Sequence, residues 1–466
     1  MIILLLLAIP LVLALLLALF RCDKIAGVVV FAGAVCHSLL CALLPFYGDA
    51  LHIAGSVTLH ADRDGFIILG VTSMLFLLTS LYLCFWLPQD EKLHRGNPVM
   101  KRSKFGMFLL IFLFTMTLTS LAQDFGMLWV AVEATTLASA PLIDFHRSKR
   151  SLEAMWKYLL ICSIGIGLAL FGTMLIAASM ESSGGLEFRS LMQLTFSGKY
   201  NPVWFKAGFV LCFAGYGLKM GLAPFHTWLP DAYSESASPV SALLSGALIN
   251  CSLLAIIRLW EIVPSPLMDF CGGYLKFFGF FSLAAAAFFI INQKDFKRVL
   301  AYSSVEHMGV ISLLLVYGLP DYVMVHVIAH SLLKMSLFLL AGNIILSYRT
   351  RSIAGVSGVF TRLPGNGSLW IFGLLLICGT PPSPLFFTEL SLVRSAGLLP
   401  GAAVLLLLLV IFCGMGQRML QMCAPGEKEV KYDEETEKLA KIPALAITLV
   451  TLLGIAVGAA WLSAGR

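Results

Sequence analysis

The sequence predicts an all-α polytopic membrane protein with about fourteen transmembrane helices, and three observations lead to this prediction. Of its 466 residues, 59% are hydrophobic and only 12% are charged. The mean hydropathy is +0.90, more than the core of a water-soluble domain requires. Apolar stretches follow one another with short polar breaks, and each has the roughly 20 residues that cross a hydrocarbon layer about 30 Å thick.

Taken in order, the apolar stretches place the expected helices at 2–20, 25–44, 65–87, 105–121, 125–144, 153–179, 203–229, 237–260, 271–291, 299–316, 320–346, 366–393, 400–420 and 442–463. The first stretch has no basic segment before it and no small-residue cleavage site, so we expect a retained helix and not a signal peptide. Glycine and proline interrupt the seventh and twelfth stretches, which predicts two broken helices. Interrupted helices in the two halves of a transporter indicate an inverted repeat.

Lysine and arginine are concentrated in alternate loops, which predicts the orientation. Short loops rich in these residues stay in the cytoplasm. Both termini are therefore expected on the periplasmic or outer side of the inner (cytoplasmic) membrane. The formal charge of +6 follows from this asymmetry, so no nucleic-acid partner is inferred. The mixed-charge tract 427–441 is expected to be a solvated cytoplasmic loop or a docking segment for a soluble partner.

The eleven cysteines are scattered, and none forms a C-x-x-C pair. The sequence also has no glycine-rich phosphate loop and no dinucleotide fingerprint. We therefore expect this chain to bind no cofactor and no metal, and to contain no catalytic centre.

Two ionisable residues fall at membrane depth in the first half of the chain. Glu133 lies in the fifth stretch and Lys219 in the seventh, next to Gly221 and Pro224. A charged group at this depth is costly and faces either a partner or water, so a structural ion pair and a functional site are both open interpretations. A break beside Lys219 would admit water, and a nearby Glu133 would then make the lysine a switchable proton site.

The second half carries a similar set. His326, His330 and Lys334 are spaced i, i+4 and i+8 and therefore share one helix face. Two histidines at this spacing can hold zinc, but no further ligand is evident; buried hydrogen-bonded histidines or a proton path are the other interpretations. Glu389 follows the break of the twelfth stretch. Glu153 and Lys157, at i and i+4, are expected to form a helix-end ion pair or to take up protons.

Several segments resemble a known family. LKMGLAPFHTWLPDAYSESASPVSALLSG, AYSSVEHMG, HVIAHSLLKMSLFLLAG and TPPSPLFFTEL are similar to the antiporter-like membrane subunits of respiratory complex I and the Mrp antiporters. EATTLASAPLI, AMWKYLL, SGALINC and SVEHMG most resemble the hydrogenase-4 component F family, found in group 4 [NiFe]-hydrogenase and formate hydrogenlyase complexes. The resemblance covers residues from about 60 to 420.

The resemblance implies fourteen helices, with helices 4–8 and 9–13 as two inverted five-helix repeats. The chain would then divide into four parts, residues 1–100, 101–262, 263–422 and 423–466. Residue by residue, it implies proton or ion translocation by Glu133, Lys219, His326, His330, Lys334 and Glu389, with Glu153, Lys157, Asn250, Glu306 and His307 as possible accessory residues. In the eighth helix, Ser245 and Asn250 stand where many relatives have a titratable residue, so water would have to bridge the path there.

The resemblance also implies partners. These are other antiporter-like and connecting membrane subunits, the soluble hydrogenase large and small subunits, and iron–sulfur proteins; the NiFe centre and iron–sulfur clusters would lie in those partners. Three functions remain open. The chain could be an ion-translocating subunit of a hydrogenase complex, the equivalent subunit of an NADH or other dehydrogenase or of a cation/proton antiporter, or a structural membrane scaffold that does not pump.

Overall fold

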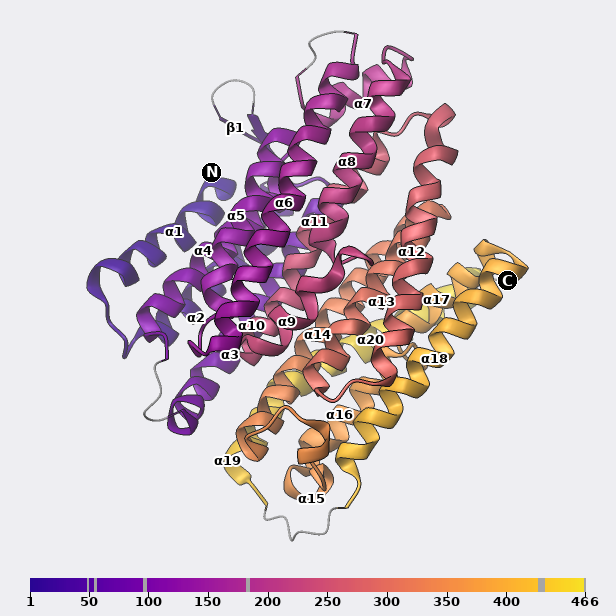
Figure 1. Ribbon diagram of the computed structural model, residues 1–466. Coiled ribbons are helices and arrows are strands. Elements are labelled where there is room, and N and C mark those ends of the chain that lie inside the picture. Colours follow the sequence, from indigo (N-terminus) through magenta and orange to yellow (C-terminus); the bar gives the residue numbers. More distant parts are fainter. Residues whose placement is uncertain (48–49, 54–56, 95–98, 182–184, 426–431, 465–466) are drawn as a thin grey trace. The chain divides into compact units, whose positions relative to one another are not determined.

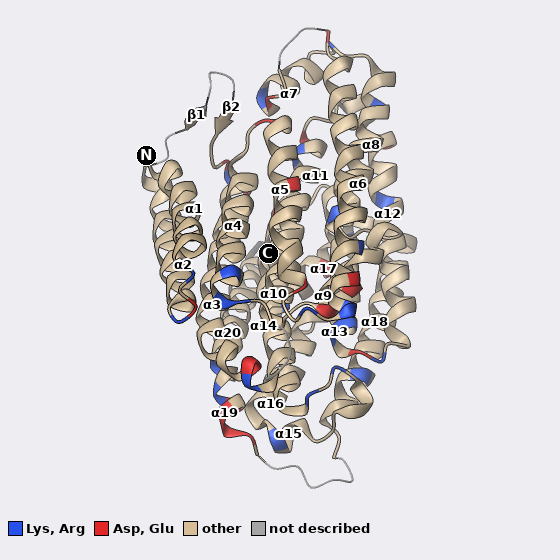
Figure 2. Ribbon diagram, turned by 60° about the vertical axis from the view of Figure 1, so that its left-hand side comes forward, with Lys and Arg blue, Asp and Glu red and all other residues tan. Residues whose placement is uncertain are grey.

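The computed structural model describes residues 1–47, 50–53, 57–94, 99–181, 185–425 and 432–464. In this part of the chain, thirteen helical segments are long and apolar enough to cross a membrane, and the shorter apolar helix Pro364–Ile377 accompanies them. The predicted all-α polytopic fold is confirmed, and each expected stretch coincides with a helix or with a broken pair of helices. Figure 2 shows that charged residues gather near helix ends and in loops, whereas the middle of most helices carries few of them.

The chain forms two compact units, each assembled from separate segments. Unit 1 comprises Met1–Ser80, Met100–Trp228 and Ala247–Phe277, and unit 2 comprises Leu81–Val99, Leu229–Gly246 and Phe278–Arg466. The division of the chain into four consecutive parts stays a prediction.

The elements of unit 1 are labelled in Figure 1 where there is room. They are α1 (Ile2–Phe20), α2 (Ala26–Leu43), η1 (Leu44–Phe46), the first part of α3 (Arg63–Leu93), α4 (Arg102–Leu121), α5 (Phe125–Ile143), α6 (Lys149–Ser179), α7 (Phe188–Phe196), α8 (Pro202–Met220), η2 (Phe225–Thr227), α11 (Ile249–Glu261), η4 (Ser265–Leu267) and the start of α12 (Met268–Ile291). A short antiparallel hairpin, β1 (Leu51–Ile53) with β2 (Val57–Leu59), pairs Leu51 with Leu59. The sequence analysis did not anticipate this hairpin or α7.

Unit 2 contains the remaining elements. They are the end of α3, α9 (Trp228–Glu235), α10 (Ser238–Leu243), the end of α12, α13 (Phe296–Val316), α14 (Pro320–Tyr348), η5 (Ile353–Gly355), α15 (Val359–Arg362), α16 (Pro364–Ile377), α17 (Pro384–Ala396), α18 (Leu398–Cys423), α19 (Glu434–Glu437), η6 (Lys438–Ala440) and α20 (Lys441–Ala464). The π-helical turn η3 (Leu244–Leu248) joins α10 to α11. Residues 427–431 of the mixed-charge tract lie outside the described residues.

Small residues allow α6 and α8 to pack closely within unit 1. A Cβ atom added to Gly215 would lie 2.3 Å from the carbonyl oxygen of Gly165, and one added to Gly172 would lie 2.6 Å from the backbone nitrogen of Cys212. Close backbone approach through small residues is the usual way in which helices associate in lipid, where apolar burial gives little advantage. These glycines therefore fix the helix that carries Lys219 against α6.

A carboxylate from outside the helix satisfies the first turn of α4. The Asp23 side chain accepts hydrogen bonds from the Ser103 backbone N–H at 2.9 Å and from the Ser103 hydroxyl at 2.6 Å. These two bonds hold the pKa of Asp23 below its ordinary value. The loop between α1 and α2 is thereby tied to the start of α4.

Both predicted breaks are present. α8 ends at Met220, followed by Gly221 in the left-handed region at φ 86°. α16 ends at Ile377, Gly379 has φ 67°, and the Ser383 hydroxyl accepts from the Leu385 backbone N–H to begin α17. A left-handed backbone favours glycine because a side chain would clash there. Glycine therefore ends both helices beside an ionisable residue. Lys219 precedes Gly221, and Glu389 of α17 lies against Gly379.

Candidate functional site

Lys219 lies in the last turn of α8, and its side chain is fully buried in unit 1. Its amine donates to the hydroxyl of Thr136 at 2.5 Å and to the hydroxyl of Tyr158 at 2.9 Å. Thr136 belongs to α5 and Tyr158 to α6. Three helices of the same unit therefore meet at this one amine.

Glu133 lies one helical turn before Thr136 on α5 and is only partly buried. Its carboxylate accepts from the Ser163 hydroxyl at 2.7 Å and from the Thr136 hydroxyl at 3.3 Å. Among the described residues of unit 1, no direct ion pair joins Glu133 to Lys219. The Thr136 hydroxyl stands between the two groups.

The hydrogen bonds indicate which group donates at each contact of this arrangement. Ser139 donates to the Thr135 carbonyl at 2.7 Å, so the Tyr158 hydroxyl, 2.7 Å from the Ser139 oxygen, donates to Ser139. The Thr136 hydroxyl donates to Glu133. Both hydroxyls thus present only lone pairs to Lys219, and Glu133 accepts on both oxygens. This pattern fits an N–H donor at Lys219 and a carboxylate acceptor at Glu133 that one hydroxyl connects.

The break after α8 sets the surroundings of Lys219. The helix loses its regular hydrogen bonds beyond Gly221, and the indole N–H of Trp228 donates to the Leu218 carbonyl at 2.9 Å. A helix end leaves carbonyls without helical partners, and an indole can satisfy one of them. The lysine is therefore held at a helix terminus, where a polar environment persists inside the bundle.

The eighth transmembrane segment is α10, η3 and α11. Asn250 is fully buried on α11, and the Ser245 hydroxyl donates within its own helix to the Ala242 carbonyl at 3.3 Å. Ser245 lies in the π-helical turn η3, and Asn250 follows that turn; such turns are frequent at functional positions. That water bridges the path beside these two residues stays a prediction.

Unit 2 brings the predicted residues of the second half together on three helices. Lys334 of α14 is fully buried and donates to the Leu300 carbonyl at 2.7 Å and to the Ser303 hydroxyl, both on α13. A ring nitrogen of His326 is 3.1 Å from one of His307, and its other ring nitrogen is 2.8 Å from the Thr388 hydroxyl of α17. The helix-face prediction for α14 is thus consistent with this arrangement.

Glu306, His307 and Glu389 lie close together beside these groups. All three are buried, and they can each offer one ligand atom so that the three atoms lie within 4.8 Å of one another. The ring of His330 is 5.0 Å from that of His307, centroid to centroid. In the described part of the chain neither ring nitrogen of His330 has a hydrogen-bond partner. Glu306 and His307, which the resemblance implies as possible accessory residues, therefore lie beside Glu389 and His330.

Glu153 and Lys157 lie on the exposed side of α6 in unit 1. Their side chains form an ion pair of 2.6 Å on α6, with 63% and 46% of their surfaces exposed. The geometry is that of the helix-end ion pair, one of the two interpretations left open. A role in proton uptake stays a prediction.

Several polar residues of these networks were not singled out from the sequence. Thr136, Tyr158, Ser163 and Thr388 are ordinary residues in an apolar helix, and only their position one turn from an ionisable residue, or their contact with one, marks them. A second overlooked group is a set of ion pairs in unit 2, Arg298 with Asp231 and Arg351 with Glu235 at 3.0 Å. Asp231 and Glu235 occur in the WLPDAYSE segment, which indicated only the family resemblance and no ion pair.

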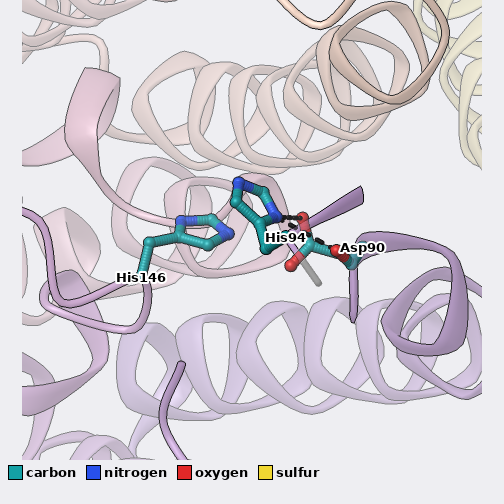
Figure 3. A group of neighbouring side chains, drawn as sticks. All are labelled: Asp90, His94 and His146. Carbon is teal, nitrogen blue, oxygen red and sulfur yellow. Dashed lines mark hydrogen bonds and ion pairs between the residues drawn. The ribbon is translucent and has the colours of Figure 1, made fainter. Parts of the chain in front are cut away.

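Two further histidines have defined contacts. His37 of α2 is buried in unit 1 and bridges the hydroxyls of Ser73 and Thr117, each at 2.8 Å. His94 follows α3 and contacts Asp90, with 3.4 Å between a ring nitrogen and the carboxylate (Figure 3). The Asp90 carboxylate raises the pKa of His94 above its ordinary value. His146, also drawn in Figure 3, belongs to unit 1.

A multi-pass bundle with two broken helices, each next to buried lysine, histidine or carboxylate groups, defines an antiporter-like membrane subunit. The comparison with known families makes this assignment specific. The chain belongs to the NADH:quinone oxidoreductase/Mrp antiporter transmembrane family, whose model matches residues 122–416.

Individual relatives agree with this family. The chain is 34% identical over 342 residues to the hydrogenase-4 component F homolog of Methylacidiphilum infernorum, covering 72% of each chain. It is 27% identical over 439 residues to hydrogenase-4 component B of Escherichia coli, covering 87% of this chain and 63% of that longer relative. A chain of the archaeal membrane-bound sulfane sulfur reductase has the same fold, with a TM-score of 0.86, 22% identity, and coverage of 98% of this chain and 95% of that one.

Proposed function

We propose that the chain is a proton- or sodium-ion-translocating subunit of a membrane-bound respiratory hydrogenase complex in the inner membrane. Redox chemistry in partner subunits would drive ion movement through its buried residues. The observation that carries this proposal is the chain of hydrogen bonds from Lys219 through Thr136 to Glu133. Lys219 lies at the end of the broken helix α8.

Electrostatics supports a role of these hydrogen-bonded residues in ion transport. Two unit charges 4 Å apart interact by about 4 kcal/mol at an effective dielectric constant of 20. Moving one charge across a membrane potential of 100 mV takes about 2.3 kcal/mol. A change in the separation of Glu133 and Lys219 therefore alters the free energy of the lysine's proton by an amount comparable with the work of transport.

The hydrogen bonds support two positions for one proton, on the Lys219 amine or on the Glu133 carboxylate. The Thr136 hydroxyl can accept from Lys219 and donate to Glu133 at the same time. If the amine proton moved to the Thr136 oxygen while the hydroxyl proton moved to the Glu133 carboxylate, one proton would pass from the amine to the carboxylate, and rotation of the hydroxyl would then reset it. Within unit 2, the buried group of His307, His326, His330, Lys334 and Glu389 would serve as a second set of proton-binding residues.

The relative from M. infernorum supports a hydrogenase assignment, because its name describes a hydrogenase-4 component. In that assignment the NiFe centre and the iron–sulfur clusters belong to soluble partner subunits. Other antiporter-like membrane subunits would flank the chain in the bilayer. The alternatives are the equivalent subunit of an NADH or other dehydrogenase, a cation/proton antiporter and a non-pumping scaffold.

Purification of the tagged chain with its native partners tests the assignment. Mass spectrometry would identify the partner chains, and elemental analysis would measure nickel and iron. Nickel with hydrogenase large and small subunits supports the proposal. Recovery of NADH-oxidising subunits without nickel contradicts the hydrogenase assignment, and redox turnover in sealed vesicles without ion movement contradicts translocation.

A further inference from the structure

The turn between α5 and α6 presents exposed cations that bind nothing within the described residues. Arg147, Lys149 and Arg150 are exposed, and in this part of the chain no hydrogen bond or ion pair engages their side chains. The acid of the same turn, Asp144, accepts from the Ser151 hydroxyl at 2.6 Å. The turn therefore carries more positive than negative charge, and its cations are available to a ligand.

The start of α4 lies beside this turn and adds two exposed lysines. The backbone N–H of Met100 donates to the Phe145 carbonyl at 3.0 Å, and the rings of Phe105 and Phe145 are 4.5 Å apart, centroid to centroid. Lys101 precedes the first turn of α4, Lys104 belongs to it, and both are exposed. These cations of unit 1 together form what we call the basic patch: Lys101, Lys104, Arg147, Lys149 and Arg150.

The backbone of Arg147 indicates that its charge is used. Arg147 has φ 47°, in the left-handed region. This region is unfavourable for any residue with a Cβ atom, and glycine is its usual occupant. Orientation in the membrane requires basic residues in the loop but not at this position. An arginine therefore stands where folding alone would favour glycine, and a strained residue of this kind points to a function.

An exposed apolar stripe on α6 begins two residues after Arg150. Leu152, Trp156 and Leu160 are 45%, 54% and 59% exposed, and the stripe continues at helical spacing along the same face. Tryptophan is common at the level of lipid headgroups. The nearest acid on this part of α6, Glu153, is paired with Lys157 and adds no net charge. The basic patch therefore adjoins the end of a lipid-facing stripe.

One class of ligand matches both the cations and the stripe. Clusters of lysine and arginine beside transmembrane helices attract anionic headgroups. An acidic soluble protein would match the charges but not the apolar stripe, and a neighbouring apolar helix would leave the cations unpaired. We propose that the basic patch binds the phosphate headgroup of an anionic phospholipid, whose acyl chains lie along the exposed stripe of α6. This binding goes beyond ion translocation and does not depend on it.

Photo-crosslinking in vesicles of known composition tests this proposal. The complex that contains the chain, with the photoreactive residue benzoylphenylalanine in place of Leu152, is reconstituted with equal amounts of phosphatidylglycerol and phosphatidylcholine that have the same acyl chains. Mass spectrometry then identifies the adducts. At Leu152, phosphatidylglycerol should exceed phosphatidylcholine at least about fivefold, the effect of roughly one cation near the surface. At Met174, which is 57% exposed near the other end of α6, the two lipids should react about equally.

Arg147→Gly separates the charge from the fold. Glycine relieves the left-handed backbone and removes one cation, so Tm in detergent should equal or exceed that of the wild type, while the phosphatidylglycerol excess at Leu152 should fall about twofold to fivefold. Arg147→Lys retains the charge and should retain the excess. A lower Tm in Arg147→Gly together with an unchanged lipid excess would mean that the arginine serves only the fold, which overturns its role in binding.

A combined variant removes most of the patch. With Arg147→Gln, Lys149→Gln and Arg150→Gln together, the lipid ratio at Leu152 should approach that at Met174, and Arg147→Gly serves if this variant fails to assemble. Lys199→Gln removes an exposed cation of unit 1 outside the patch and is the matched control, with an unchanged ratio. Equal adducts of the two lipids at Leu152 in the wild type, an unchanged ratio in the combined variant, or adducts with a partner protein in place of lipid would overturn the proposal.

Discussion

Lys219 and Glu133 are joined through a single hydroxyl: the amine of Lys219 donates to Thr136, and Thr136 donates to the carboxylate of Glu133. The two charged residues lie on different helices, and Thr136 lies one turn from Glu133 on α5. The coupling between the lysine and the glutamate therefore depends on a residue that carries no charge.

Thr136→Val tests this dependence. Valine has nearly the same shape but no hydroxyl, so the amine and the carboxylate lose their connection, and ion movement per redox turnover should fall by about tenfold or more, corresponding to a loss of about 1.4 kcal/mol. The measurement is ion uptake by sealed vesicles during redox turnover.

Thr135→Val is the matched control for this substitution. Thr135 is equally buried on the same helix, and its hydroxyl donates only to the Val132 carbonyl, at 2.6 Å. Vesicles with this variant should behave as the wild type. Equal losses in both variants would mean that Thr136 acts only through packing.

Gly215→Ala should destabilise the protein by about 1–3 kcal/mol, because its new methyl group would overlap the Gly165 carbonyl where α6 and α8 touch. Gly217→Ala, two residues further on the same helix, meets nothing closer than 3.4 Å and should be neutral or slightly stabilising. Thermal unfolding in detergent compares the two variants. A more stable Gly215→Ala variant would contradict the close helix contact.

The ion pair of His94 with Asp90 predicts a pH-dependent contribution to stability. The carboxylate raises the pKa of His94, so the stabilisation is fully present below the ordinary histidine pKa of 6.5 and is lost as pH rises through the higher folded value. His94 is partly exposed, so the contribution of the pair is at most about 1 kcal/mol. The Tm difference between wild type and His94→Gln should shrink from pH 6 to pH 8.5. A difference that does not change with pH would contradict the predicted charge state.

Reporter fusions test the orientation that the basic loops predict. Fusions after Lys104, Arg150 or Arg298 should report the cytoplasm, and a fusion after Gly185 should report the exterior, because short loops rich in lysine and arginine are retained inside. Alkaline phosphatase and green fluorescent protein activities measure the two locations. Reversed signals at these four sites would overturn the predicted orientation.

The sequence predicted the helices well because lipid imposes a simple rule of length and apolarity on each span. It also placed the two breaks, since Gly221 and Gly379 are followed by prolines within an otherwise apolar stretch. The β1–β2 hairpin was missed because three-residue strands carry no periodic signal. Its position outside the long apolar stretches offered no other indication.

The candidate site was predicted only in part. Charged residues such as Lys219 and Lys334 stand out in an apolar sequence, but the hydroxyls that bind them do not. Thr136 and Thr388 look the same as Thr135, and only the packing of distant helices selects them. The pairing of Glu306 with Glu389 similarly depends on α13 and α17 meeting, which one sequence cannot reveal.

Ion translocation by Glu133→Gln and Lys219→Ala variants tests the central claim most directly. The measurement is ion uptake into sealed vesicles per redox turnover, with the amount of assembled complex determined in the same preparation. Both variants should assemble normally and show strongly reduced coupled uptake, since one lacks the counter-charge and the other lacks the exchanging amine. Normal assembly with full coupled uptake in both variants would contradict the account and reduce the pair to a structural role.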